Sequence, residues 1–142
     1  MGEEADPLKR RIAFLQIFRI LREGRRGWYG EDMENLPEDV IEALRYMDLH
    51  LKEEIGIRPL AAMCGVSVNT LERHFKEALG VSPLAMLRKK RLILSMEYLR
   101  EGESVTEAAM KSGFSDYSNY IQLFRKQFGI TPLQYKKTVE KD

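Results

Sequence analysis

A short pattern of residues occurs twice in the chain, and this internal repeat constrains the fold more than any other feature. The first copy comprises Ala61, Gly65, Val66, Ser67, Leu71, Phe75, Gly80 and Pro83. The second copy comprises Ala109, Gly113, Phe114, Ser115, Tyr120, Phe124, Gly129 and Pro132. The offset is 48 residues up to the serine and 49 residues after it, so the second copy has one extra residue just after its turn. Two copies are too few for a solenoid, and they indicate two examples of one helical motif.

Each copy has the residues that a helix-turn-helix unit requires. The first glycine supplies the positive φ of a sharp turn between two helices, and the serine hydroxyl can cap the second helix. The two apolar residues lie four positions apart and therefore share one face of that helix. The second glycine ends the helix, and the proline begins the next one after Ser82 or Thr131. We therefore expect units over residues 58–80 and 105–129, with Ser67 and Ser115 as caps.

The remainder of the chain also indicates helices, because apolar residues recur at intervals of three and four and never alternate over strand lengths. The expected fold is all-α, with two helix-turn-helix subdomains joined by a long helix over about residues 84–101. An N-terminal helix within residues 1–23 and a linker over 24–37 precede the domain at 38–138. The first helix of that domain is expected to run from residue 38 to Gly56. Shorter helices are expected over 59–64, 68–79, 105–111, 116–128 and 132–138.

The distribution of charge favours an anionic partner for the second part of the chain. Residues 1–57 carry 9 basic and 13 acidic side chains, whereas residues 58–142 carry 14 basic and 9 acidic ones. The part that contains both units is therefore the candidate for contact with phosphates. Together with two full copies of the motif, this bias favours binding to double-stranded DNA. The alternative is a protein-interaction module that uses the same fold without DNA, and it would require exposed apolar clusters where these positions are mostly polar or basic.

Other classes of protein are disfavoured by what the sequence lacks. It has neither a Gly-rich phosphate loop after a strand nor a pairing of nucleophile and base, so we expect no enzyme and no cofactor. One cysteine, Cys64, and two histidines cannot supply a four-ligand zinc site, and we expect Cys64 to be a buried core residue. Because no run of about 20 apolar residues is present and the acidic start makes a poor signal peptide, we expect a cytoplasmic protein without membrane association.

Residues from about 40 to 138 resemble the DNA-binding domain of the AraC/XylS family of bacterial transcription regulators. The second motif carries most of this resemblance, through Gly113-Phe114-Ser115-Asp116, Phe124-Arg125-Lys126, Phe128-Gly129-Ile130-Thr131-Pro132 and Tyr135. The pairs Arg91-Leu92 and Tyr98-Leu99 fit the joining helix of the family. The resemblance implies seven helices, double-stranded DNA as the partner and regulation of transcription, with activation as the family's habit and RNA polymerase as a further partner.

Four positions depart from the common pattern of the family. Ala108 stands where the family usually has Ile, and Ser95 stands where it usually has Ala. We interpret both as packing variations. Ile121 and Gln122 stand where Ser and Arg are frequent. These two lie on the expected DNA-facing surface, so they affect the expected base preference and not the fold.

The second helix of each unit is expected to contact bases. In the first unit the resemblance places Asn69, Glu72 and Arg73 toward the bases, with Thr70 at the edge. Arginine suits guanine, asparagine suits adenine and glutamate suits cytosine, although Glu72 could instead hold Arg73 in place. In the second unit the candidates are Tyr117, Ser118, Ile121 and Gln122, where Ile121 suits either a thymine methyl group or a helix crossing. Candidate phosphate contacts, which need only charge and reach, are Arg58, Lys76, Lys89, Lys90, Arg125 and Lys126.

The length of the joining helix suggests how one chain can contact two sites on DNA. A helix over about residues 84–101 is roughly 27 Å long at 1.5 Å per residue. Two recognition helices held that far apart can enter successive major grooves, which are about 34 Å apart, with some bending of the DNA.

Members of this family commonly carry a separate sensor and dimerisation domain, and 142 residues leave no room for one. The apolar helix over residues 8–23 looks like the terminal dimerisation helix of such a domain. We therefore expect either the tail of a larger regulator or a short relative, with any small-molecule effector acting through the sensor. The alternative is that this helix folds back on the C-terminal domain.

A homodimer formed through residues 8–23 can be tested by sedimentation. We expect the whole chain to sediment as a dimer and a variant that lacks residues 1–23 to sediment as a monomer, because the deletion removes the apolar face that would be shared. A chain that is monomeric with and without these residues would exclude the dimer.

Overall fold

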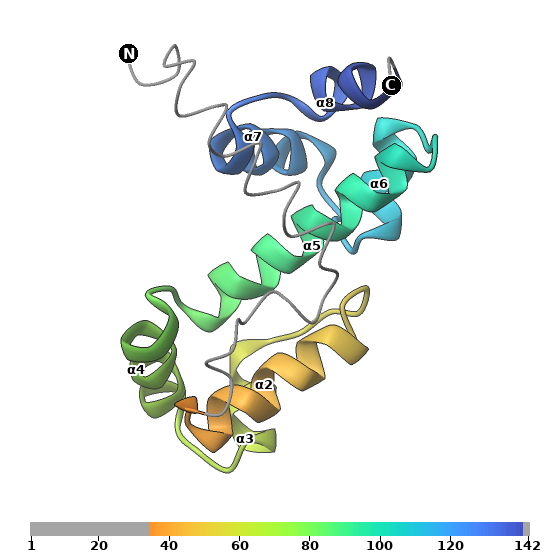
Figure 1. Ribbon diagram of the computed structural model, residues 1–142. Coiled ribbons are helices and arrows are strands. Elements are labelled where there is room, and N and C mark those ends of the chain that lie inside the picture. Colours follow the sequence, from red (N-terminus) through yellow and green to blue (C-terminus); the bar gives the residue numbers. More distant parts are fainter. Residues whose placement is uncertain (1–34, 141–142) are drawn as a thin grey trace. The chain divides into compact units, whose positions relative to one another are not determined.

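The computed structural model describes residues 35–140, and the regular structure in this range consists of helices without strands (Figure 1). With the labels of Figure 1, the seven helices are α2 (Glu38–Leu49), α3 (Ile57–Met63), α4 (Val68–Leu79), α5 (Pro83–Arg100), α6 (Val105–Lys111), α7 (Tyr117–Phe128) and α8 (Pro132–Glu140). This confirms the expected all-α class. The helix expected over 8–23 and most of the linker lie outside the described residues. Within residues 35–140, no helix has the length and apolar character that a membrane span requires.

The described residues form two compact units. One unit, residues 35–91, contains α2, α3, α4 and the first half of α5. The other unit begins at Leu92 and contains the rest of α5 with α6, α7 and α8. Each unit therefore holds one of the two expected helix pairs, α3 with α4 and α6 with α7, and the chain passes between the units within α5.

Helix α2 is shorter than the sequence predicted, because it ends at Leu49 and not near Gly56. The chain turns after His50, whose carbonyl accepts a hydrogen bond from the Glu53 amide at 3.0 Å. Arg91 holds this turn, since its Nε donates to the Leu51 carbonyl at 2.9 Å and a second guanidinium nitrogen donates to the Glu53 carbonyl. A side chain from α5 thus satisfies backbone carbonyls that a longer helix would have paired.

The core of the second unit is largely aromatic. The ring of Phe124 lies 4.7 Å from that of Phe128 and 5.8 Å from that of Tyr120, between ring centres. Both pairs are close to edge-on, a geometry that stabilises aromatic packing. Tyr135 of α8 adds a further ring at 6.1 Å from Phe124. Tyr135 therefore packs α8 against the aromatic face of α7, and buried residues of α5 and α6 complete the same core cluster.

A buried hydrogen bond links α7 to α5 within this unit. The Tyr120 hydroxyl donates to Ser95 Oγ at 2.9 Å, and Ser95 Oγ donates to the Leu92 carbonyl at 2.5 Å. Both side chains are fully buried, and burial raises the pKa of Tyr120 to about 12. Ser95, expected only as a packing variation, therefore also supplies the acceptor that a buried phenol needs.

Helices α4 and α7 are capped by different types of residue. Ser67 caps α4 as expected, because its Oγ accepts a hydrogen bond from the Thr70 amide at 3.1 Å. The cap of α7 is Asp116, whose Oδ1 accepts from the Asn119 amide at 3.0 Å, so the prediction of Ser115 is wrong. The extra residue of the second copy moves the start of the helix on by one position. Gly65 and Gly113 have φ of +72° and +96°, as the sharp turns require.

Replacing the cap of α7 should therefore destabilise the fold at Asp116 and not at Ser115. We expect Asp116→Ala to lower the free energy of unfolding by about 0.5–2 kcal/mol, because it removes the acceptor at the start of the helix. The matched variant Ser115→Ala should stay within about 0.5 kcal/mol of the unchanged protein. Urea unfolding followed by circular dichroism measures both, and a larger loss at Ser115 would contradict this assignment.

Cys64 is partly buried, where full burial was expected. Burial, together with the nearby carboxylates of Glu42 and Asp39, raises the pKa of its thiol to about 11. The thiol therefore stays protonated at neutral pH and is a poor nucleophile.

This pKa predicts slow alkylation of Cys64 in the folded protein. At pH 8, a shift from 9.0 to about 11 lowers the thiolate fraction about 100-fold, and the rate with iodoacetamide should fall accordingly. The rate should keep rising with pH up to about 11. Mass spectrometry measures the reaction, with the urea-unfolded chain as the control. Equal rates for the folded and unfolded chains would contradict the prediction.

Candidate nucleic-acid interface

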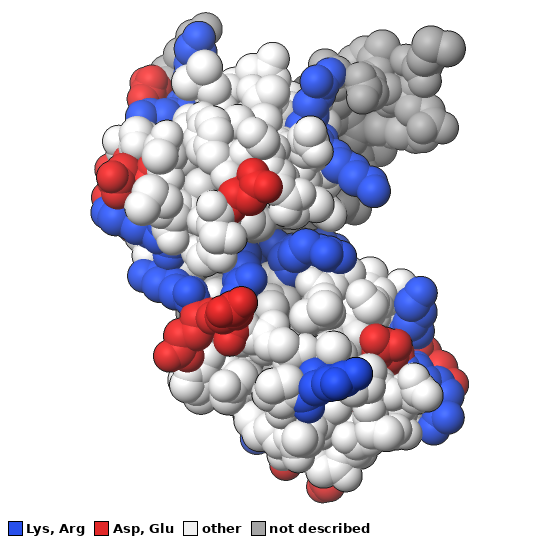
Figure 2. Space-filling model, turned by 180° about the vertical axis from the view of Figure 1, so that it is seen from behind, with Lys and Arg blue, Asp and Glu red and all other residues white. Residues whose placement is uncertain are grey.

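Charge does not mark one continuous interface on the face of the molecule drawn in Figure 2. Figure 2 shows basic and acidic side chains in separate small groups on a face that is mostly uncharged. The candidate interface must therefore be built from the exposed faces of the recognition helices, α4 and α7, and from the basic side chains near them.

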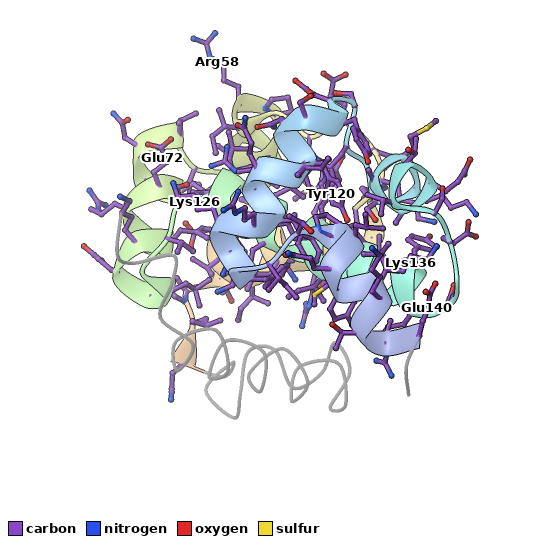
Figure 3. All side chains as sticks on the ribbon, turned by 90° about the horizontal axis from the view of Figure 1, so that it is seen from above. Arg58, Glu72, Tyr120, Lys126, Lys136 and Glu140 are labelled. Carbon is purple, nitrogen blue, oxygen red and sulfur yellow. The ribbon has the colours of Figure 1, made fainter. Side chains whose placement is uncertain are left out.

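Helix α4 has one buried face and one exposed polar face. Leu71 and Phe75 are 0% exposed and pack in the core of the first unit. Thr70 is partly buried at the margin, and its hydroxyl accepts a hydrogen bond from Ser67 at 2.9 Å. The exposed residues of the opposite face are Asn69, Glu72, Arg73 and Lys76. Glu72 can be found on the surface of α4 in Figure 3.

Helix α7 has the same organisation in the second unit. Tyr120, Phe124 and Phe128 are buried, and Figure 3 shows Tyr120 directed into the interior. Ile121 is partly buried and packs against the core cluster of this unit, so the structure supports a packing role for it. The exposed residues of α7 are Tyr117, Ser118, Asn119, Gln122, Arg125, Lys126 and Gln127.

Most of the predicted phosphate-contacting side chains reach solvent, but Lys90 does not. Arg58, Lys76, Arg125 and Lys126 are exposed, Lys89 is partly buried, and Figure 3 shows Arg58 extending away from the ribbon. Lys90 is 7% exposed, and its Nζ lies 2.6 Å from Asp48 Oδ1 of α2. Contrary to the expectation, Lys90 is therefore directed into its own unit.

The basic run at residues 88–91 contains an exposed side chain, Arg88, that is not among the predicted phosphate contacts. Arg88 is exposed, while Lys90 is buried and Arg91 bonds the carbonyls after α2. Leu87 and Leu94, both buried, lie three residues before and four residues after Lys90. Arg88 likewise has a buried leucine, Leu92, four residues after it. The helical period therefore does not distinguish Arg88 from Lys90, and the contact of Lys90 with Asp48 of α2 does.

Comparisons with known proteins support an interface for DNA. Residues 60–138 match the family model described as a helix-turn-helix domain. The HTH-type transcriptional activator RhaS of Klebsiella pneumoniae (strain 342) is 32% identical over 136 residues, which are 93% of this chain and 48% of that protein. RhaS of Enterobacter sp. (strain 638) is 30% identical over 129 residues, which are 90% of this chain and 45% of that protein. The chain thus spans about half the length of these curated relatives.

Solved structures share the fold over most of the described residues. The DNA-binding domain of AdpA, a global transcriptional factor, was crystallised in complex with a target DNA. It has a TM-score of 0.69 and 27% identity, covering 74% of this chain and 96% of that one. A probable AraC family transcriptional regulator from Rhodopseudomonas palustris CGA009 has a TM-score of 0.67 and 26% identity, covering 72% of this chain and 98% of that one.

Proposed function

This chain belongs to the AraC/XylS family of bacterial transcription regulators, and on that premise we propose that it binds specific double-stranded DNA and activates transcription. The proposal is supported mainly by the arrangement of side chains on α4 and α7. Each helix is capped at its start, buries an apolar face and exposes a polar face. A helix of this kind can lie in a major groove and present side chains to base edges.

We assign base contacts to the exposed faces of the two helices. On α4, Arg73 suits a bidentate contact to guanine and Asn69 suits adenine, with Glu72 accepting from cytosine or holding Arg73. On α7, the proposed base contacts are Tyr117, Ser118 and Gln122, with Ile121 at the margin. The phosphate contacts are Arg58, Lys76, Arg88, Lys89, Arg125 and Lys126.

We also propose that the two recognition helices enter successive major grooves and bend the DNA. The 18 residues of α5 correspond to about 27 Å of helix at 1.5 Å per residue, which suits sites one turn apart.

The remaining partners are proposed from the relatives and from the DNA-binding role. Relatives named as transcriptional activators support RNA polymerase as a second partner. A small-molecule effector would act through a sensor domain, and residues 8–23, outside the described range, would form the homodimer. A protein that binds chromosomal DNA in a bacterium acts in the cytoplasm.

The proposal is tested by selecting bound sequences from a pool of randomised duplexes at two salt concentrations. We expect two short motifs about one helical turn apart, with affinity falling steeply as salt rises. If no sequence is selected and binding is absent at low salt, the DNA-binding function is wrong for this chain, and the protein-interaction module becomes the better interpretation.

Arg73→Ala should weaken binding and relax base preference at one motif only. Loss of a bidentate arginine costs about 1–3 kcal/mol, which is about 5- to 150-fold in Kd. The matched control is Arg45→Ala, which removes an exposed arginine of α2 outside both recognition helices. Equal effects of the two variants on preference would contradict the role of Arg73.

A further inference from the structure

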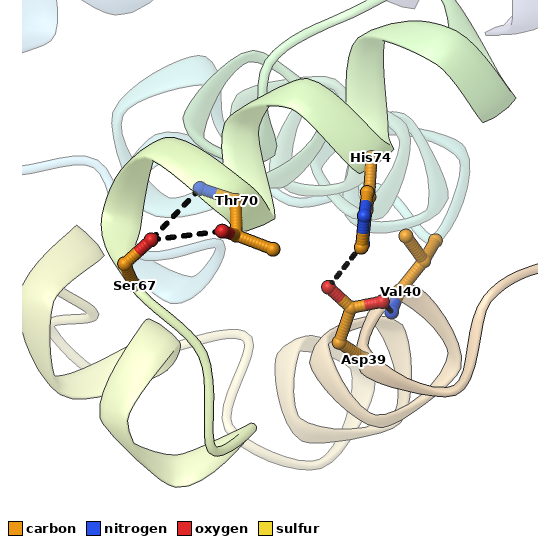
Figure 4. A network of polar contacts seen from close by, with 5 residues as sticks. All are labelled: Asp39, Val40, Ser67, Thr70 and His74. Carbon is orange, nitrogen blue, oxygen red and sulfur yellow. Dashed lines mark hydrogen bonds and ion pairs between the residues drawn. The ribbon is translucent and has the colours of Figure 1, made fainter.

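A side-chain hydrogen bond links the recognition helix α4 to the first turn of α2 (Figure 4). His74 Nδ1 lies 2.7 Å from Asp39 Oδ2. The other carboxylate oxygen, Oδ1, accepts a hydrogen bond from the Val40 amide at 3.0 Å. The Asp39 side chain is 7% exposed and that of His74 is 29% exposed. The carboxylate is therefore almost enclosed, with a partner on each of its oxygens.

This hydrogen bond orients α4, whose other contacts with its unit are largely apolar. Leu71 and Phe75 hold α4 in the core of its unit, but apolar burial is non-directional. A hydrogen bond to a carboxylate depends on both distance and angle, so it restricts rotation of α4 about its axis. His74 lies four residues after Thr70 on α4, so the pair acts at the edge of the proposed base-contacting face.

We propose that Asp39 and His74 are positioning residues, which orient α4 so that Asn69 and Arg73 meet base edges. This proposal rests on the DNA-binding function proposed above for α4. In this proposal neither residue contacts DNA. Asp39 is buried, and the Nδ1 atom of His74 is already hydrogen-bonded to the Asp39 carboxylate.

Through Asp39, the orientation of α4 depends on the first turn of α2. Asp39 lies two residues after Pro37, where the chain enters the helix. The buried side-chain hydrogen bond of α7, from Tyr120 to Ser95, runs to α5 instead. The Asp39–His74 pair therefore influences one DNA motif and leaves the other unaffected.

Two substitutions of His74 separate positioning from general stability. The side-chain amide of His74→Asn reaches about as far as Nδ1 and keeps a donor for Asp39. The longer amide of His74→Gln carries its nitrogen near the place of Nε2 and removes that donor. Both variants replace the imidazole ring by a side-chain amide, so they differ mainly in whether the amide nitrogen can reach Asp39.

The readouts are duplex selection, titration of the selected duplex and urea unfolding, all on the full chain. We expect His74→Gln to broaden base preference at the motif read by α4 and to weaken binding by about 10- to 150-fold, the range that corresponds to one broken hydrogen bond to a charged group. His74→Asn should restore most of both properties. The motif read by α7 should be unchanged in both variants. If His74→Gln does not fold, Asp39→Ala carries the same test, because it removes the carboxylate oxygen that faces Nδ1 of His74.

Each result decides between the proposals. If the unchanged protein selects two motifs and His74→Gln selects them with the same preference and affinity, the positioning role is wrong. The role is also wrong if both motifs weaken equally, in proportion to the loss of stability, because the pair would then be only structural. If the unchanged protein selects no sequence, the DNA-binding function fails, and the positioning role fails with it.

Discussion

Burial of two large side chains, four residues apart, determines what each recognition helix can present to a partner. On α4 these are Leu71 and Phe75, and on α7 they are Tyr120 and Phe124, all 0% exposed. Exposing a side chain of this size costs about 1.5–3 kcal/mol. Neither helix can therefore turn its apolar face toward solvent without unfolding its unit. The polar face of each helix is therefore set by the core, before any contact with DNA.

The sequence was sufficient for features that depend on neighbours along the chain. The turn glycines, the cap at Ser67 and the inward face of each helix all follow from local spacing. Features that depend on partners far along the chain were not predictable in this way. The end of α2 depends on Arg91, which lies about 40 residues beyond the carbonyls that it bonds.

The error in the cap of α7 has a physical cause that the sequence did contain. The one-residue insertion in the second copy shifted the cap from Ser115 to Asp116, and the offset of 49 residues already indicated that shift. Lys90 of the candidate site was chosen for its charge, and its burial depends on Asp48 of α2, which lies far away along the chain. Ile121 is a similar case, because only the packing of its unit shows that it is partly buried.

The hydrogen bond between Tyr120 and Ser95 limits the order in which this chain can change over evolutionary time. A change of Ser95 to alanine would leave the buried Tyr120 hydroxyl without its acceptor, which costs about 1–3 kcal/mol. A change of Tyr120 to phenylalanine would leave Ser95 still bonded to the Leu92 carbonyl. The substitution of Tyr120 by phenylalanine is therefore expected to come before that of Ser95 by alanine. Descendants that carry alanine at position 95 should already have lost the hydroxyl group of residue 120.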